Sequence, residues 1–74
     1  MVRKISHSAC IYAARAEAAL CDMDAREALV LAKRSWSLRR NRRAARCAAL
    51  SLCATGEFAA ALHWHRKFSQ IDTG

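Results

Sequence analysis

The stretch CATGEFAAALHWHRKFSQID, residues 53–72, holds an isolated Gly-Glu-Phe between two alanine-rich runs. Gly56 can adopt the positive φ that ends a helix, because glycine has no Cβ. Glu57 follows at the start of the next helix, where the helix dipole stabilises a carboxylate. The stretch therefore predicts a corner between two packed helices, and it predicts that the aromatic residues behind the corner are packing residues.

The rest of the chain has the composition of a helical protein. Its 74 residues contain no proline and only two glycines, and the strong helix formers Ala, Leu, Arg, Glu and Lys dominate. No segment alternates apolar and polar residues with the period of two that a strand requires. These features predict an all-α fold in one small domain, residues 1–74.

Apolar residues recur at steps of three and four and predict four helices, at about residues 6–20, 25–39, 42–54 and 57–71. Asp24 and Glu27 form a D-x-x-E pair, close to a capping box, at the start of the second helix. Asn41 is expected to adopt the left-handed conformation that ends this helix. The predicted packing stripe of the last helix consists of Phe58, Ala61, Leu62, His65 and Phe68.

The short loops predict that each helix packs antiparallel to the one before it. The result is two helical hairpins, at about residues 6–40 and 42–72. Ala28-Leu29 of the first hairpin and Ala61-Leu62 of the second occupy matching places, which indicates an internal repeat. We call the number of residues from Ala28 to Ala61 the repeat length, so that a residue one repeat length later occupies the matching place in the second hairpin.

The second hairpin resembles a tetratricopeptide repeat. Gly56 and Phe58 match the corner glycine and the following tyrosine of that family, and Ala61 matches the small residue of its second helix. The chain departs from the family at Ala45, where a tryptophan is usual. It also departs at Met23, which stands at the glycine place of the first hairpin.

This resemblance covers about residues 9–74 and implies an interaction module rather than an enzyme. In such repeats the first helix of each hairpin lines a groove that holds a peptide or a helix. Carried over by position, the groove residues are Cys10, Ala13, Glu17, Leu20, Arg43, Arg46, Leu50 and Cys53. The asparagines that complete a carboxylate clamp in some family members are absent, so the expected partner is an acidic or amphipathic helix or peptide.

The resemblance also bears on the number of repeats. Stacked repeats usually need three or more units to be stable. Two units leave an apolar face open, and we expect a second copy or a partner helix to cover it. Small proteins of this kind with two or three repeats act as chaperones of bacterial type III secretion subunits, which is a role by analogy.

The chain is basic, with a formal net charge of +7, and this balance favours acidic partners. Guanidinium groups pair with both carboxylates and phosphates. The alternative function is therefore that of a small nucleic-acid-binding protein. A third possibility is that the arginines are only a solvated helix end and contact no partner. The densest basic patch consists of Arg39, Arg40, Arg42, Arg43 and Arg46.

No metal, cofactor or catalytic site is expected. The four cysteines form no C-x-x-C pair, and their alanine-rich surroundings predict buried, reduced thiols in a cytoplasmic protein. His63 and His65 are two residues apart and face different sides of a helix, so they do not form a helical zinc pair, and His65 is expected to be buried or half-buried. Cys53 and His65 could meet across the last hairpin, but nothing marks that thiol as activated. No segment approaches the roughly 18 apolar residues of a membrane span.

Overall fold

The computed structural model describes residues 2–71, with side chains from His7 onward. Its helices are α1 (Val2–Cys21), α2 (Ala25–Leu38), α3 (Arg42–Ala54) and α4 (Phe58–Gln70). No strand occurs in this part of the chain. The all-α prediction is therefore confirmed, and the main difference in boundaries is that α1 begins at Val2 rather than near residue 6.

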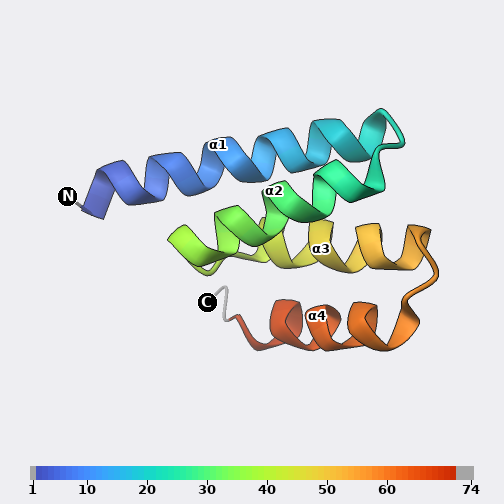
Figure 1. Cartoon of the computed structure of the whole chain (residues 1–74). Helices are drawn as coiled ribbons and strands as arrows, with labels where there is room; N and C mark the ends of the chain where they lie inside the picture. Colours follow the sequence, from blue (N-terminus) through green and yellow to red (C-terminus); the bar gives the residue numbers. More distant parts are fainter. Residues whose placement is uncertain (1, 72–74) are drawn as a thin grey trace.

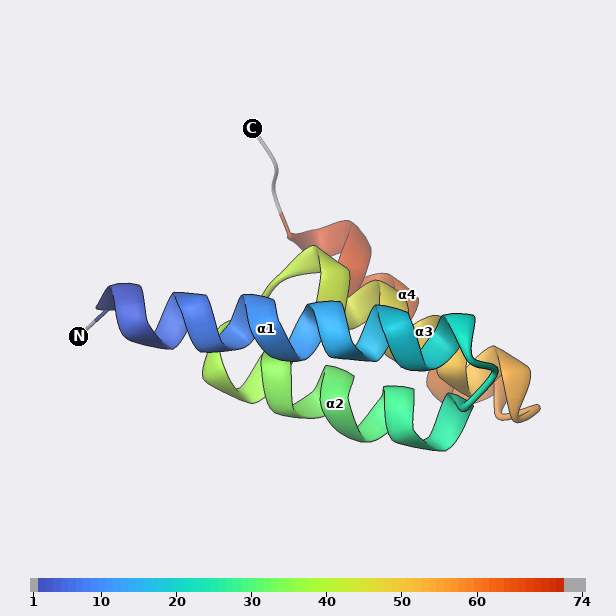
Figure 2. The same ribbon diagram turned by 90° about the horizontal axis from the view of Figure 1, so that it is seen from above.

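Figure 1 shows the helices stacked in chain order, from α1 at the top to α4 at the bottom, each antiparallel to the one before. Helix α3 packs against both helices of the first hairpin as well as against α4. Seen from above, α1 and α2 lie side by side, with α3 and α4 behind them (Figure 2). No Cα atom of α4 comes within 8 Å of one in α1 or α2. The hairpins therefore form an open array rather than a closed bundle.

The two hairpin corners have the same hydrogen-bond pattern. At the first, Met23 N–H donates to the Leu20 carbonyl at 3.0 Å and Asp24 N–H donates to the Ala19 carbonyl at 2.8 Å. The second corner repeats both bonds one repeat length later, at 3.1 Å and 2.9 Å. This is the Schellman arrangement, which needs a left-handed residue just after the helix. Met23 (φ 62°) and Gly56 (φ 84°) supply that residue.

The corner between α2 and α3 corrects the prediction for Asn41. This residue has extended backbone angles, φ −155° and ψ 151°, and it caps the N-terminus of α3 instead of ending α2. Its Oδ1 accepts from Ala44 N–H at 2.8 Å, and its Nδ2 donates to the Ser35 hydroxyl at 3.1 Å. The buried Ser35 hydroxyl in turn donates to the Ala9 carbonyl at 2.6 Å. A chain of polar contacts thus joins α1, α2 and α3, and it replaces the left-handed stop that the sequence suggested.

The core is built almost entirely from small side chains. Apart from Cys47 and Leu52, every buried apolar residue among those described is an alanine. Small side chains let helices approach closely, but each buries little apolar area. Among the described large apolar residues only Leu52 is buried, and the others are either half-buried at the edges or exposed. Trp36 and Trp64 are such edge groups, and they meet edge to face with ring centroids 5.3 Å apart.

The packing stripe predicted for α4 is wrong for three of its residues, which are exposed. Ala61 is buried and Phe68 is half-buried, as expected. Phe58 and Leu62 are 69% and 53% exposed, and His65 is also exposed. Helix α4 is covered by α3 on one side, and no described element covers the side that carries Phe58 and Leu62.

Candidate functional site

Helices α1 and α3 lie next to each other and form the face on which the groove was predicted. Two hollows open on this face. The first, of about 260 Å³, is lined by Ala9, Cys10, Ala13, Arg39, Asn41 and Arg43. The second, of about 340 Å³, is lined by Glu17, Leu20, Cys21, Arg46, Cys47 and Leu50. We call this surface the α1–α3 groove.

An ion pair between the two helices separates the hollows. Arg43 donates to Glu17 through both Nε, at 3.0 Å, and a terminal guanidinium nitrogen, at 2.6 Å. The hydrogen bond from Arg43 lowers the pKa of the Glu17 carboxyl, and the same bond raises the pKa of Arg43. Both side chains remain substantially exposed, so an incoming charged group can reach the pair.

The groove residues predicted from sequence fall into three sets. Cys10, Glu17, Arg43 and Arg46 border the hollows, and Ala13 is fully buried in the wall of the first hollow. Leu20 also borders a hollow, but it is half-buried and packs on the core. Leu50 borders the second hollow and also a separate hollow between α3 and α4, on the far side of the second hairpin. Cys53 borders only that separate hollow.

Sequence reasoning missed Ala9, Cys21, Arg39 and Asn41 as groove residues. Arg39 and Asn41 belong to the loop after α2, and their position depends on the cap of α3 and on the bond to Ser35. The strong helix-capping preference of asparagine was the sequence signal that could have placed this corner.

The predicted basic patch is divided between different surroundings. The Arg42 guanidinium carbon lies 4.1 Å from the centre of the Phe68 ring, and the buried Arg42 Nε has no hydrogen-bond partner among the described residues. Arg43 is paired with Glu17. Arg39, Arg40 and Arg46 are exposed and border two different parts of the surface. The five arginines therefore do not form one continuous phosphate-binding strip.

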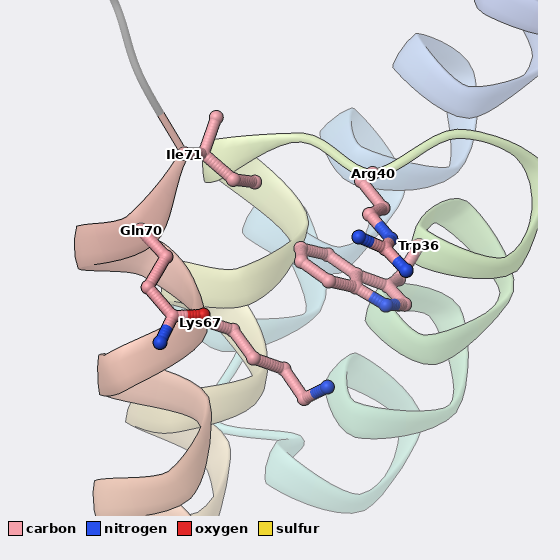
Figure 3. A pocket seen from close by; sticks show the side chains of 5 residues that line it. All are labelled: Trp36, Arg40, Lys67, Gln70 and Ile71. Atoms are coloured by element: carbon pink, nitrogen blue, oxygen red, sulfur yellow. The ribbon is translucent and has the colours of Figure 1, made fainter.

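A further hollow of about 320 Å³ lies between α2 and α4 and is lined by Trp36, Arg40, Lys67, Gln70 and Ile71. Figure 3 shows the Trp36 ring with the Arg40 guanidinium beside it and Lys67 reaching across from α4. The Lys67 ammonium is 5.3 Å from the Trp36 ring centre and 5.4 Å from that of Trp64. These distances suit cation–π contacts, so Lys67 ties α4 to α2.

Another surface lies on the far side of the second hairpin, where α3 meets α4. A shallow hollow of about 310 Å³ is lined by Ala49, Leu50, Cys53, Phe58, Ala61, Leu62 and His65. We call it the end face. Its lining is almost wholly apolar and includes three exposed large side chains, those of Leu50, Phe58 and Leu62.

The cysteines depart from the buried state predicted for them. Only Cys47 is buried, whereas Cys10, Cys21 and Cys53 are exposed, and all four are free thiols. Burial raises the pKa of the Cys47 thiol. Cys53 and His65 do border the same end face. Within the described part of the chain, no three His, Cys, Asp or Glu side chains gather where they could hold a metal.

Comparisons with protein-family models, with curated proteins and with solved structures found no match to this chain. None of the helices in residues 2–71 has both the length and the apolar character needed to cross a membrane.

Proposed function

We propose that this protein is a non-enzymatic protein-binding module, an adaptor or chaperone, that holds an acidic amphipathic helix in the α1–α3 groove. The observation that carries this proposal is the pair of hollows on one face, with exposed arginines beside them. They centre near Cys10 and Leu20 of α1, and a helix rises 1.5 Å per residue, so they lie roughly 15 Å apart. Two apolar anchors of one partner helix can fill hollows at that separation.

The charges around the groove select the partner. Arg39, Arg43 and Arg46 border the hollows, and Glu17 is the acidic residue there, already paired with Arg43. A partner with carboxylates beside its apolar anchors gains attraction from these guanidinium groups, whereas a basic partner is repelled. The net charge of +7 acts in the same direction at longer range.

A labelled synthetic peptide tests this proposal by fluorescence anisotropy. The peptide is an amphipathic helix with leucines on one face, two of them about 15 Å apart along the axis, and glutamates flanking that face. We expect Cys10→Glu combined with Arg46→Glu to abolish binding, because both side chains are exposed and border the groove. Val30→Glu, at an exposed site of α2, is the matched control and should bind as the native protein does. Equal binding by all three proteins would refute the proposal.

Glu17→Gln gives a second and opposite readout. The substitution leaves Arg43 without its carboxylate, so the guanidinium becomes available to a carboxylate of the peptide, and affinity should rise severalfold. Loss of affinity would contradict a groove that attracts acidic partners.

Nucleic acid is the competing ligand, and salt separates the two. Binding to a short nonspecific DNA should fall steeply with salt if several phosphates are neutralised. The divided surroundings of the basic patch favour the protein partner, for which we expect only a modest dependence on salt. A steep salt slope on DNA, together with no peptide binding, would replace the proposal with the nucleic-acid alternative.

A further inference from the structure

The end face is the counterpart, in the second hairpin, of a surface that the first hairpin keeps covered. Cys47 and Ala48 of α3 pack on the first hairpin at Ala16 of α1 and Ala32 of α2, with Leu20 and Leu29 beside them. Each contacted residue of α1 and α2 has a counterpart one repeat length later in the sequence. The counterparts of Ala16, Leu20, Leu29 and Ala32 are Ala49, Cys53, Leu62 and His65. All four line the end face.

Because the two hairpins have the same corner geometry, the covered surface shows what shape the end face accommodates. The occupant of that surface is the helix α3, which packs there through the small side chains of Cys47 and Ala48. Ala44 and Ser51, one turn to either side of Cys47, are also small and buried. An occupant of the end face needs a similar stripe, free to make contact. Docking of such a stripe would bury Phe58 and Leu62, which are exposed and which no described element covers.

The chain itself carries a stripe at the equivalent positions, in which Ile11 is larger than its counterpart Ala44. The residues one repeat length before Ala44, Cys47 and Ser51 are Ile11, Ala14 and Ala18 of α1. All three are exposed, and they follow the spacing of one helix face. We call them the α1 stripe. It belongs to α1 and the end face to α3 and α4, and Figure 1 shows α1 and α4 at opposite ends of the array, so one molecule cannot join the two.

We propose that the α1 stripe of one copy docks on the end face of a second copy, so that the chain assembles head to tail and continues the stacking of its own hairpins. Such a contact joins two different surfaces, and it therefore leaves each end of the assembly able to bind again. This inference goes beyond the proposed function, since it concerns other surfaces and needs no foreign partner.

Charge limits the strength of this contact. Each copy carries a net charge of +7, so copies repel one another until salt screens them. Arg15 adds to the repulsion, because it stands where α3 has the fully buried Ala48. The association should therefore strengthen as salt is raised, which is the opposite of the response expected for an acidic partner or for DNA.

Sedimentation velocity of the full chain, from micromolar to millimolar concentration, provides the test. We expect the mass of the native protein to rise with concentration, to pass beyond that of a dimer, and to rise further at high salt. Phe58→Glu places a charge on the end face, and Ala14→Glu places a charge on the α1 stripe. Each should weaken association by about tenfold or more, because one buried apolar contact is lost. Arg15→Ala should strengthen it.

The decisive sample is a mixture of Phe58→Glu and Ala14→Glu. Each variant retains the surface that the other lacks, so the mixture should form a one-to-one dimer that grows no further. A symmetric contact between two end faces predicts instead that Ala14→Glu dimerises alone and that the mixture contains no mixed dimer. That result, or a native protein that stays monomeric at every concentration and salt, would overturn the proposal. Ala14, Arg15 and Phe58 are all exposed. Circular dichroism of the variants, compared with the control Val30→Glu, verifies that they remain folded.

Discussion

Exchanging the two corner residues tests whether the hairpins are structural repeats of each other. Met23 holds a left-handed backbone, φ 62°, and its side chain is 92% exposed, so replacing it removes almost no packing. A left-handed conformation costs an L-residue about 1–2 kcal/mol, and glycine loses about 0.5–1 kcal/mol more backbone freedom on folding. Met23→Gly should therefore raise the free energy of unfolding by about 0.5–1 kcal/mol.

The reverse change at the second corner should have the opposite sign. A Cβ built on Gly56 meets nothing within 4 Å, so Gly56→Met is strained by its φ of 84° alone. We expect it to lower the free energy of unfolding by about the same 0.5–1 kcal/mol. Sites this far apart without shared partners add, so the double exchange should unfold close to the native temperature.

Thermal unfolding followed by far-ultraviolet circular dichroism measures all three variants. For a domain of this size, the single changes correspond to shifts in midpoint of about 2–8 °C, upward for Met23→Gly and downward for Gly56→Met. A lower midpoint for Met23→Gly would refute the reasoning, because it would mean that the methionine side chain stabilises the corner through contacts rather than straining it.

Three further predictions concern other parts of the fold. Ser35→Ala should lower the free energy of unfolding by about 1–2 kcal/mol, since it removes the hydroxyl that bonds Ala9 and Asn41; a denaturation midpoint equal to the native value would contradict that network. Because Arg43 lowers the pKa of Glu17, the stability from this pair is present above the ordinary glutamate value of about 4.3 and is lost as pH falls through the lowered pKa; Glu17→Gln should flatten that part of a stability–pH curve, and an unchanged curve would show that the pair contributes nothing. A thiol reagent should modify three cysteines quickly and Cys47 slowly, because burial raises the pKa of that thiol; rapid reaction of all four, with folding intact, would contradict its burial.

The sequence alone determined what depends on neighbours within one helical turn. The capping oxygen of Asp24 accepts from Glu27 N–H at 3.2 Å, and Gly56 adopts the positive φ expected at its corner. Hydrogen bonds between residues three to five apart fix the helix ends and the corners, and all of their donors and acceptors can be read from a short segment. The four helices and the two hairpins followed from these local signals.

The tertiary structure decided which side of each helix is covered. The spacing of Phe58, Ala61 and Leu62 is the same whether a neighbour lies over them or not, so it could not show that only Ala61 is buried. Asn41 likewise has two well-attested roles at a helix end, and the position of Ser35, earlier in the chain but buried against α1, favours the cap over the left-handed stop. Burial and pairing depend on elements far away in the chain, and for that reason the α1–α3 groove, the divided arginines and the uncovered end face emerged only once the helices were in place.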